Sequence, residues 1–229
     1  LYLSSAETGT ASVDFPTGTD VNVVINSGVT SEVVVPANDE MSGSNTGQIS
    51  NKVIRITSTI PISVYGCSRE FATSDCTNFI PISSWGNRYR PLSYPTTIGT
   101  LGDRITVLTG NDAATVTMKF KTAVTTASGT FAAGDEVSTV MAPNMVWTLE
   151  AINEDQGFTG SLITSTAPIG VIAGAECING FGGACDTNVE MVPPESSWGK
   201  NFFLNNYRND NNPGGSGVRI LASQDTTTV

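Results

Sequence analysis

The side chains best suited to chemistry in this sequence are carboxylates and thiols. Neighbouring carboxylates occur at Asp135-Glu136 and at Glu154-Asp155, and two carboxyl groups that flank a sugar can hydrolyse a glycosidic bond. Neighbouring residues of a strand, however, point to opposite faces of its sheet. A hydrolase site would therefore have to be assembled from distant carboxylates, and we expect no catalysis from these pairs.

Histidine is absent from the 229 residues. Its imidazole is the most common general base near neutral pH and a frequent metal ligand. Without it, a Ser-His-Asp triad, a Cys-His pair and a zinc site with imidazole ligands cannot form. We therefore expect a protein that is not an enzyme, has no cofactor and binds no metal.

The four cysteines form two close pairs, Cys67 with Cys76 and Cys177 with Cys185, each in a stretch rich in Gly, Ser and Asn. Neither spacing is the C-x-x-C knuckle that favours a four-thiolate metal site, so we predict one disulfide within each pair. Closing loops this short removes roughly 2.5 to 3 kcal/mol of unfolded-state entropy. Disulfides indicate an oxidising compartment, and we expect an extracellular or cell-surface protein.

Two stretches rich in side-chain oxygens, 153–157 and 205–212, have the donor atoms that Ca²⁺ prefers. Neither has the spacing of a known calcium loop, and exposed turns favour Asn, Asp and Gly for backbone reasons alone. We interpret both stretches as turns.

The charge balance restricts the partners. The chain has 11 Lys and Arg against 21 Asp and Glu, a formal net charge of -10, which repels polyphosphate backbones and anionic lipid surfaces. We expect neither nucleic acid binding nor membrane insertion, because no run approaches the roughly 18 apolar residues of a spanning helix. The sequence opens at Leu1 without a leader, and we expect a processed or excised chain.

The elements that must position these residues are strands. Short runs rich in Val, Ile, Thr, Phe and Tyr recur between clusters of Gly, Asn, Asp, Ser and Pro, and convincing helical periodicity is missing. We predict an all-β fold with hairpins at 21–35 and 104–120, the second turning at 110–112. The predicted strands form four consecutive sets: 1–5, 12–15, 21–26 and 32–35; 53–57, 61–65, 78–82 and 88–93; 104–109, 115–120, 136–141 and 145–151; 161–165, 169–173, 188–192 and 201–205.

The second and fourth sets repeat each other. The sequence Ile-Thr-Ser-Thr-Ile-Pro-Ile-Ser-Val at 56–64 matches Ile-Thr-Ser-Thr-Ala-Pro-Ile-Gly-Val at 163–171, and Ser-Ser-Trp-Gly occurs at 83–86 and 196–199. Because residues 219–223 echo 104–108, we predict repeat units at about 1–103 and 104–217 and a truncated third unit from 218. The predicted structural anchors of the repeat are Pro61, Trp85, Gly86, Pro168, Trp198 and Gly199.

Two architectures suit these units: a β-propeller with four-stranded antiparallel blades, or tandem β-sandwiches. We favour the propeller, because consecutive meanders with similar openings suit blades. Trp85 and Trp198 could be aromatic platforms for a ligand, but an indole at the same place in two repeats more often fills the same packing niche. We interpret both as packing anchors.

At the repeated segments the chain resembles the N-terminal domain of IgG Fc-binding proteins, a family of secreted mucus and surface proteins with bacterial extracellular relatives. The resemblance covers nearly the whole chain and is carried by 21–36, by the Thr-x-Pro-Ile-x-Val strands at 59–64 and 166–171, and by 177–199. The family usually has Cys-Asp-His after its second cysteine, where this chain has Cys185-Asp186-Thr187, so a role of that histidine is not carried over. The resemblance implies an extracellular structural or binding role without known chemistry.

We therefore expect a non-catalytic structural or adhesive interaction module of an extracellular matrix, mucus or surface filament protein. Its expected partners are other proteins or sister copies, as a homo-oligomer or filament, with glycans as further candidates. The alternative is a glycan- or receptor-binding lectin-like module, which the acidic, Asn-rich loops favour.

Overall fold

The computed structural model describes residues 1–41, 46–69, 73–95, 101–178, 186–204, 218–224 and 227–228. These residues form strands, turns and the short 3-10 helices η1 (Ala37–Asp39), η3 (Ile82–Ser84) and η4 (Glu195–Ser197), and no α-helix occurs among them. The all-β prediction is confirmed.

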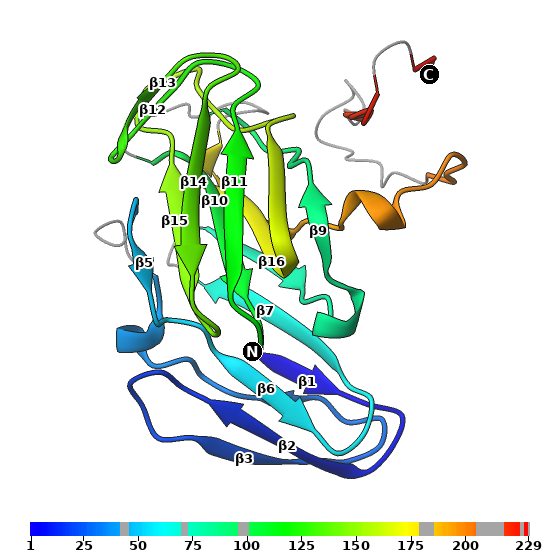
Figure 1. Ribbon diagram of the computed structural model, residues 1–229. Coiled ribbons are helices and arrows are strands. Elements are labelled where there is room, and N and C mark those ends of the chain that lie inside the picture. Colours follow the sequence, from blue (N-terminus) through cyan, green and yellow to red (C-terminus); the bar gives the residue numbers. More distant parts are fainter. Residues whose placement is uncertain are drawn as a thin grey trace.

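The N-terminal half forms two small antiparallel sheets at the bottom of Figure 1, with strand orders β4-β1-β7-β8 and β3-β2-β6. The chain crosses from one sheet to the other between β1 and β2, between β3 and β4, and between β6 and β7. The core between the two sheets includes Leu3, Val13 and Ile25, which are fully buried. The strands are β1 (Tyr2–Ser4), β2 (Gly9–Asp14), β3 (Val21–Ile25), β4 (Ser31–Glu32), β6 (Arg55–Ser58), β7 (Ser63–Arg69) and β8 (Ser74–Asn78).

Most strands of the C-terminal half, together with β5 and β9, form one eight-stranded sheet that folds over on itself. Its main order is β14-β11-β16-β10-β15-β5, and β9 and β17 also pair with β16. A separate hairpin, β12–β13, lies near one end (Figure 1). The strands are β5 (Ile49–Ser50), β9 (Gly86–Tyr89), β10 (Asp103–Thr109), β11 (Ala114–Lys119), β12 (Val124–Thr126), β13 (Gly129–Phe131), β14 (Glu136–Met141), β15 (Val146–Glu150), β16 (Leu162–Ile178) and β17 (Asp186–Met191).

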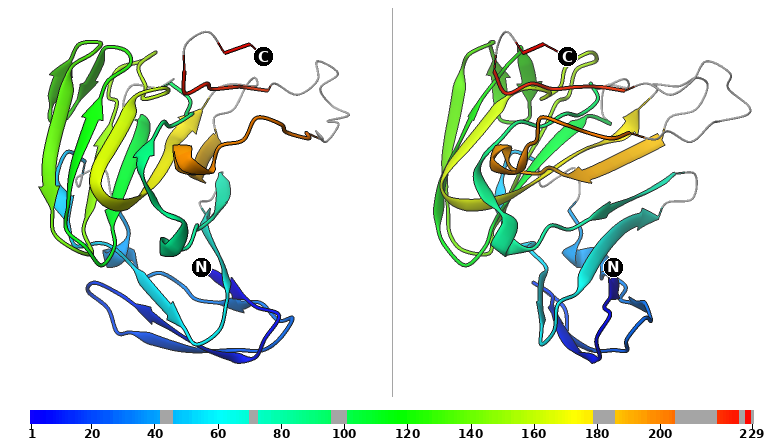
Figure 2. Two further views of the ribbon diagram at one scale, coloured as in Figure 1. Left: turned by 45° about the vertical axis from the view of Figure 1, so that its right-hand side comes forward. Right: turned by 90° about the vertical axis from the view of Figure 1, so that its right-hand side faces the viewer.

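The long bent strand β16 connects the two layers of this sheet. The first part of β16 pairs with β11 and β9, and its second part pairs with β10 and β17. Strands β11 and β10 lie end to end along β16. On their other sides, β14 pairs with β11 and β15 pairs with β10. A hydrogen bond from Asn144 N to Gly110 O (2.9 Å) continues that ladder across the bend. Figure 2 shows β16 curving from one layer to the other.

The two predicted hairpins are wrong. Residues 110–112 form a bend between layers, and both strands beside them pair with β16. Strand β3 pairs with β2, and β4 pairs with β1, so 21–35 also crosses between sheets. A Gly-Asn-Asp cluster permits either a reversal or a bend, and the long-range partners decide between them.

Several other predicted strands also differ from the structure. Residues 162–165 and 169–173 belong to the single strand β16, and residues 201–204 of the predicted strand 201–205 are not in a strand. Of the predicted strand 78–82, only Asn78 lies in a strand, at the end of β8. The favoured propeller is not confirmed. A blade keeps four consecutive strands in one sheet, whereas β1 to β4 are divided between two sheets.

Both halves pair their strands in the same order. Strand β1 lies between β4 and β7 as β10 lies between β15 and β16, and β2 lies between β3 and β6 as β11 lies between β14 and β16. The Thr-x-Pro motifs also act alike: the Thr59 hydroxyl accepts from Thr10 N (3.0 Å), and the Thr166 hydroxyl accepts from Thr115 N (2.9 Å). The two halves thus share a pairing order, and the predicted repeat units stay a prediction.

Candidate interaction surface

The first predicted disulfide is present. Cys67 and Cys76 lie opposite each other on β7 and β8 and are joined by an S–S bond of 2.05 Å. Cys177 is buried in β16 and is disulfide-bonded as well. Cys185 lies outside the described residues, so the Cys177–Cys185 pairing stays a prediction.

The two repeat prolines lie at crossing points of the chain. Pro61 lies between β6 and β7, where its carbonyl accepts a hydrogen bond from the Ser5 hydroxyl (2.7 Å). Pro168 lies within β16, between Thr164 and Ile169, where the register with β9 shifts. Both are exposed and lie where a strand passes from one layer to the other. A proline suits such a bend because it has no N–H to leave unpaired.

The two repeat tryptophans have the same local structure. Each follows a 3-10 helix and donates its indole N–H to a carbonyl five residues earlier, Trp85 to Ile80 O (2.9 Å) and Trp198 to Pro193 O (3.3 Å). Both are half-buried. The ring of Trp85 packs over Gly170 of the C-terminal half, where an added Cβ would lie 2.7 Å from it. This placement supports the packing interpretation for Trp85.

The glycines after the tryptophans differ. An added Cβ at Gly86 would lie 2.7 Å from the Cβ of Pro194, so a side chain there would force the backbone of β9 away. At Gly199 the nearest atom would be 3.6 Å away, on the Phe202 ring, which is ordinary contact. Gly86 is therefore required by close packing, and Gly199 is not in the present arrangement.

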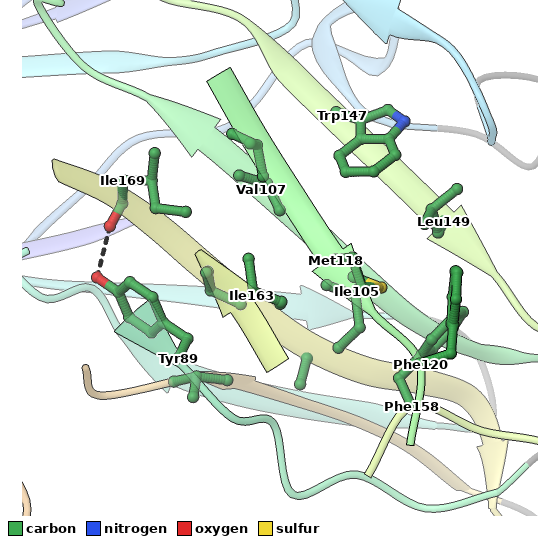
Figure 3. Packing of buried hydrophobic residues seen from close by; sticks show 14 of the residues in the cluster. Tyr89, Ile105, Val107, Met118, Phe120, Trp147, Leu149, Phe158, Ile163 and Ile169 are labelled. Carbon is green, nitrogen blue, oxygen red and sulfur yellow. Dashed lines mark hydrogen bonds between the residues drawn. The ribbon is translucent and has the colours of Figure 1, made fainter. Parts of the chain in front are cut away.

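After Trp85 the chain leaves the N-terminal half, and β9 joins the sheet of the C-terminal half. Tyr89 pairs with Ile163, and Gly86 pairs with Ile169. The Tyr89 side chain is 1% exposed, its hydroxyl donates to Ile169 O, and Gly86 N donates to that hydroxyl (2.9 Å). Figure 3 shows its ring beside Ile163. Burial raises the pKa of Tyr89 above its usual value.

Strand β5 covers a second edge of the C-terminal sheet. Ile49 and Ser50 pair with Trp147 and Val146 of β15. The ladder continues through Gly47, whose N–H donates to Thr148 O (2.7 Å). Segments of the N-terminal half therefore complete both layers of the C-terminal sheet.

Side chains of β8 and of Thr73 just before it cover the outer edge of β17. The Thr73 hydroxyl accepts from Thr187 N (2.6 Å), Asp75 Oδ2 from Val189 N (2.8 Å), and the Thr77 hydroxyl from Met191 N (2.8 Å). Alternate side chains of a strand point the same way, so three acceptors at 73, 75 and 77 meet three donors at 187, 189 and 191. Side-chain oxygens thus replace a backbone ladder between the two halves.

Replacing Thr77 with valine should lower the free energy of unfolding by about 1 to 3 kcal/mol, because the buried Met191 N–H loses its acceptor while the shape of the side chain is kept. Thr77→Ser, which keeps the hydroxyl, is the matched control and should cost less. Urea denaturation of both variants measures the difference. Equal losses would show that the hydroxyl does not stabilise the junction.

The carboxylates considered for catalysis have structural contacts. Asp135 Oδ2 accepts from Ala132 N (2.8 Å), and Glu136 forms an ion pair with Lys119 (3.0 Å). Glu154 and Asp155 lie exposed in a turn, where Asp155 has a positive φ of 61°. In the described ranges, no group of three or more Cys, Asp or Glu could hold a metal ion. The oxygen-rich stretch 205–212 lies outside the described residues.

A buried carboxylate that the sequence analysis missed lies at the start of β10. Asp103 is fully buried, and its Oδ2 accepts from the Ser93 hydroxyl (2.6 Å) and from Phe158 N (2.7 Å). Burial raises the pKa of Asp103 to about 7, although these hydrogen bonds and the charge of Arg219 favour ionisation. The guanidinium of Arg219 donates to Ser93 O and lies 4.7 Å from the centroid of the Tyr94 ring.

None of the helices in the described ranges has the length and apolar character needed to cross a membrane.

Comparison with known proteins identifies the family. No curated protein and no solved structure matches the chain. The family model described as IgGFc binding protein matches residues 75–229, more than half of the chain. The matched stretch begins in β8 and includes β9 together with the whole of β16, the strand with which β9 pairs. The resemblance seen in the sequence is thus confirmed, and the chain belongs to the IgGFc-binding protein family.

Proposed function

We propose that this chain is a non-catalytic protein-binding module that works outside the cell, as a structural or adhesive part of a matrix, mucus or surface filament protein. The description of its family, which names binding to IgG Fc, supports a protein partner. The Cys67–Cys76 disulfide is compatible with secretion, because disulfides persist in oxidising compartments.

The observation that carries this proposal is the sharing of strands between the halves. Strands β9 and β5 continue the C-terminal sheet by backbone pairing, and β8 covers β17 through side-chain acceptors. Separating the halves would break these hydrogen bonds and expose Tyr89 to water. Interlocked units of this kind suit a protein that must keep its shape under load.

Exposed apolar side chains support binding to a protein surface. Val34 and Val140 are more than 70% exposed, and Phe202, Phe203 and Leu204 form an exposed run after η4. Single exposed residues such as Val34 and Val140 are common on soluble proteins, whereas the consecutive run is informative, because contiguous apolar surface marks interaction sites. Aromatic side chains are moreover enriched at the centres of interfaces.

An immobilised chain tests the proposal when it is probed with IgG Fc, with secreted mucus proteins, with the chain itself and with a glycan array. We expect saturable binding of at least one protein, unchanged by a chelator or by removal of the partner's sugars. Heat-denatured chain is the control. Saturable binding of a sugar would support the lectin-like alternative, and a folded chain that binds none of the probes would refute the proposal.

A further inference from the structure

The N-terminal half lacks a strand that the C-terminal half has. In the C-terminal half, one layer has the order β14-β11-β16-β9, and its fourth strand comes from the N-terminal half. The corresponding sheet of the N-terminal half is β3-β2-β6. Among the described residues, no strand pairs with the outer side of β6.

The outer edge of β6 presents backbone groups that can pair. Thr59 N donates to Thr10 O, and Val13 lies opposite Ile56. Since hydrogen-bonded and non-hydrogen-bonded pairs alternate in an antiparallel ladder, the N–H and C=O of Ile56 face away from β2. Its counterpart in the repeat, Ile163, pairs on that side with Tyr89.

Apolar residues of β6 and of the segment that follows it are also less covered than their counterparts. Ile163, Ile169 and Val171 belong to β16, the strand with which β9 pairs, and all three are fully buried. Their counterparts Ile56, Ile62 and Val64 are only partly buried. The difference indicates that something similar to β9 is missing from the N-terminal half.

The chain contains a second segment of the β9 type. Residues 199–204 follow η4 and Trp198 as β9 follows η3 and Trp85, and the two 3-10 helices have the same capping pattern. By alignment of the two Ser-Ser-Trp-Gly motifs, Phe202 corresponds to Tyr89. Phe202 is 71% exposed where Tyr89 is 1% exposed.

We propose that residues 199–204 of one copy of this chain add as an antiparallel strand to β6 of a second copy. By analogy with β9 and β16, Phe202 would lie opposite Ile56, and Asn201 opposite Thr57. Donor and acceptor are different surfaces, so the contact is head-to-tail and repeats along a filament unless it closes into a ring. The inference rests on the proposed function and names its partner.

Two features of the chain set the expected strength of this contact. Each copy has a formal net charge of -10, so salt should strengthen the association by screening repulsion. In the repeat alignment, Ser63 corresponds to Gly170. Gly170 lies under the ring of Trp85, and an added Cβ there would be 2.7 Å from that ring. Trp198 therefore cannot approach Ser63 as closely, and Ser63→Gly should tighten the association.

Cysteine cross-linking tests the register. Thr57 and Asn201 are exposed, and a directly opposed, non-hydrogen-bonded pair has Cα atoms about 4.5 Å apart, within reach of a disulfide. A mixture of Thr57→Cys and Asn201→Cys chains should form disulfide-linked dimers under mild oxidation. Arg55→Cys is the matched control, because two residues along the strand the Cα separation rises to about 7 to 8 Å.

Sedimentation measures the strength of the contact. Phe202→Asp should weaken self-association by about tenfold or more, because the aromatic ring can no longer be buried. Ser63→Gly should strengthen it. Equal cross-linking by Thr57→Cys and Arg55→Cys chains, or a native chain that stays monomeric at high salt, would refute strand donation. In either case, binding of Fc or of another secreted protein would leave the proposed function intact.

Discussion

Replacing Tyr89 with alanine is expected to lower the free energy of unfolding by about 3 to 5 kcal/mol, the range for truncating a large buried aromatic side chain. Tyr89 is among the largest fully buried side chains and fills the space between β9 and the first part of β16. Its loss leaves a cavity beside Ile163 and Ile169, and β9 keeps only its backbone pairing. The variant should therefore weaken the connection between the halves as well as the core.

The Tyr89→Phe variant distinguishes the contribution of the hydroxyl to stability from that of the ring. It keeps the ring but removes the group that donates to Ile169 O and accepts from Gly86 N, so the expected loss is about 1 to 3 kcal/mol. Urea denaturation compares the two variants, and hydrogen exchange at the amides of β9 shows whether that strand has been released. If the alanine and phenylalanine variants lost the same stability, packing of the ring would not be what holds β9.

The features of the fold that the sequence predicts correctly are local. Alternation of apolar and polar residues indicates strands wherever one face is buried, as in β10, whose residues alternate between buried and half-buried. The Cys67–Cys76 disulfide follows from a short spacing in one β-hairpin. The matching sequence segments 56–64 and 163–171 also indicate equivalent positions, and Thr59 and Thr166 make equivalent hydrogen bonds.

The features that the sequence does not predict depend on long-range pairing. Residues 110–112 have a composition that suits both a hairpin turn and a bend between layers, and the partner that decides between them, β16, lies about fifty residues later. The same holds for β9. The Ser-Ser-Trp-Gly motif is visible at 83–86, but nothing local indicates that the next strand pairs with Ile163 and Ile169.

Asp103 is an intermediate case. The alternation of β10 places residues 103, 105, 107 and 109 on one face, and three of them are apolar or small enough for a core. The predicted strand begins at 104 and so leaves Asp103 out, although the same alternation, extended by one residue, would place its carboxylate inward. The alternation does not predict the partners, because Ser93, Phe158 and Arg219 come from three separate segments.

Stability is expected to fall between pH 4 and pH 7 because of Asp103. Its pKa is about 7 in the folded protein, chiefly because of burial, against an ordinary value of 3.8. Below pH 3.8 both states hold the proton, and Asp103 gives no pH dependence. Between these values the unfolded state releases its proton while the folded state retains it, so stability falls as pH rises. The loss is complete above pH 7 and amounts to at most about 4 kcal/mol.

Asp103→Asn should remove this pH dependence, because the amide stays neutral and its oxygen can still accept from Phe158 N. Urea denaturation at intervals from pH 4 to pH 8 measures the difference between variant and parent, which should grow in favour of the variant as pH rises. Asp112→Asn, which removes a carboxylate from an exposed bend, controls for the change in net charge. If the free energy of unfolding of the Asp103→Asn variant and of the parent changed with pH in the same way, Asp103 would ionise alike in the folded and unfolded chains. The buried junction of Ser93, Asp103 and Phe158 would then hold a carboxylate without cost to folding.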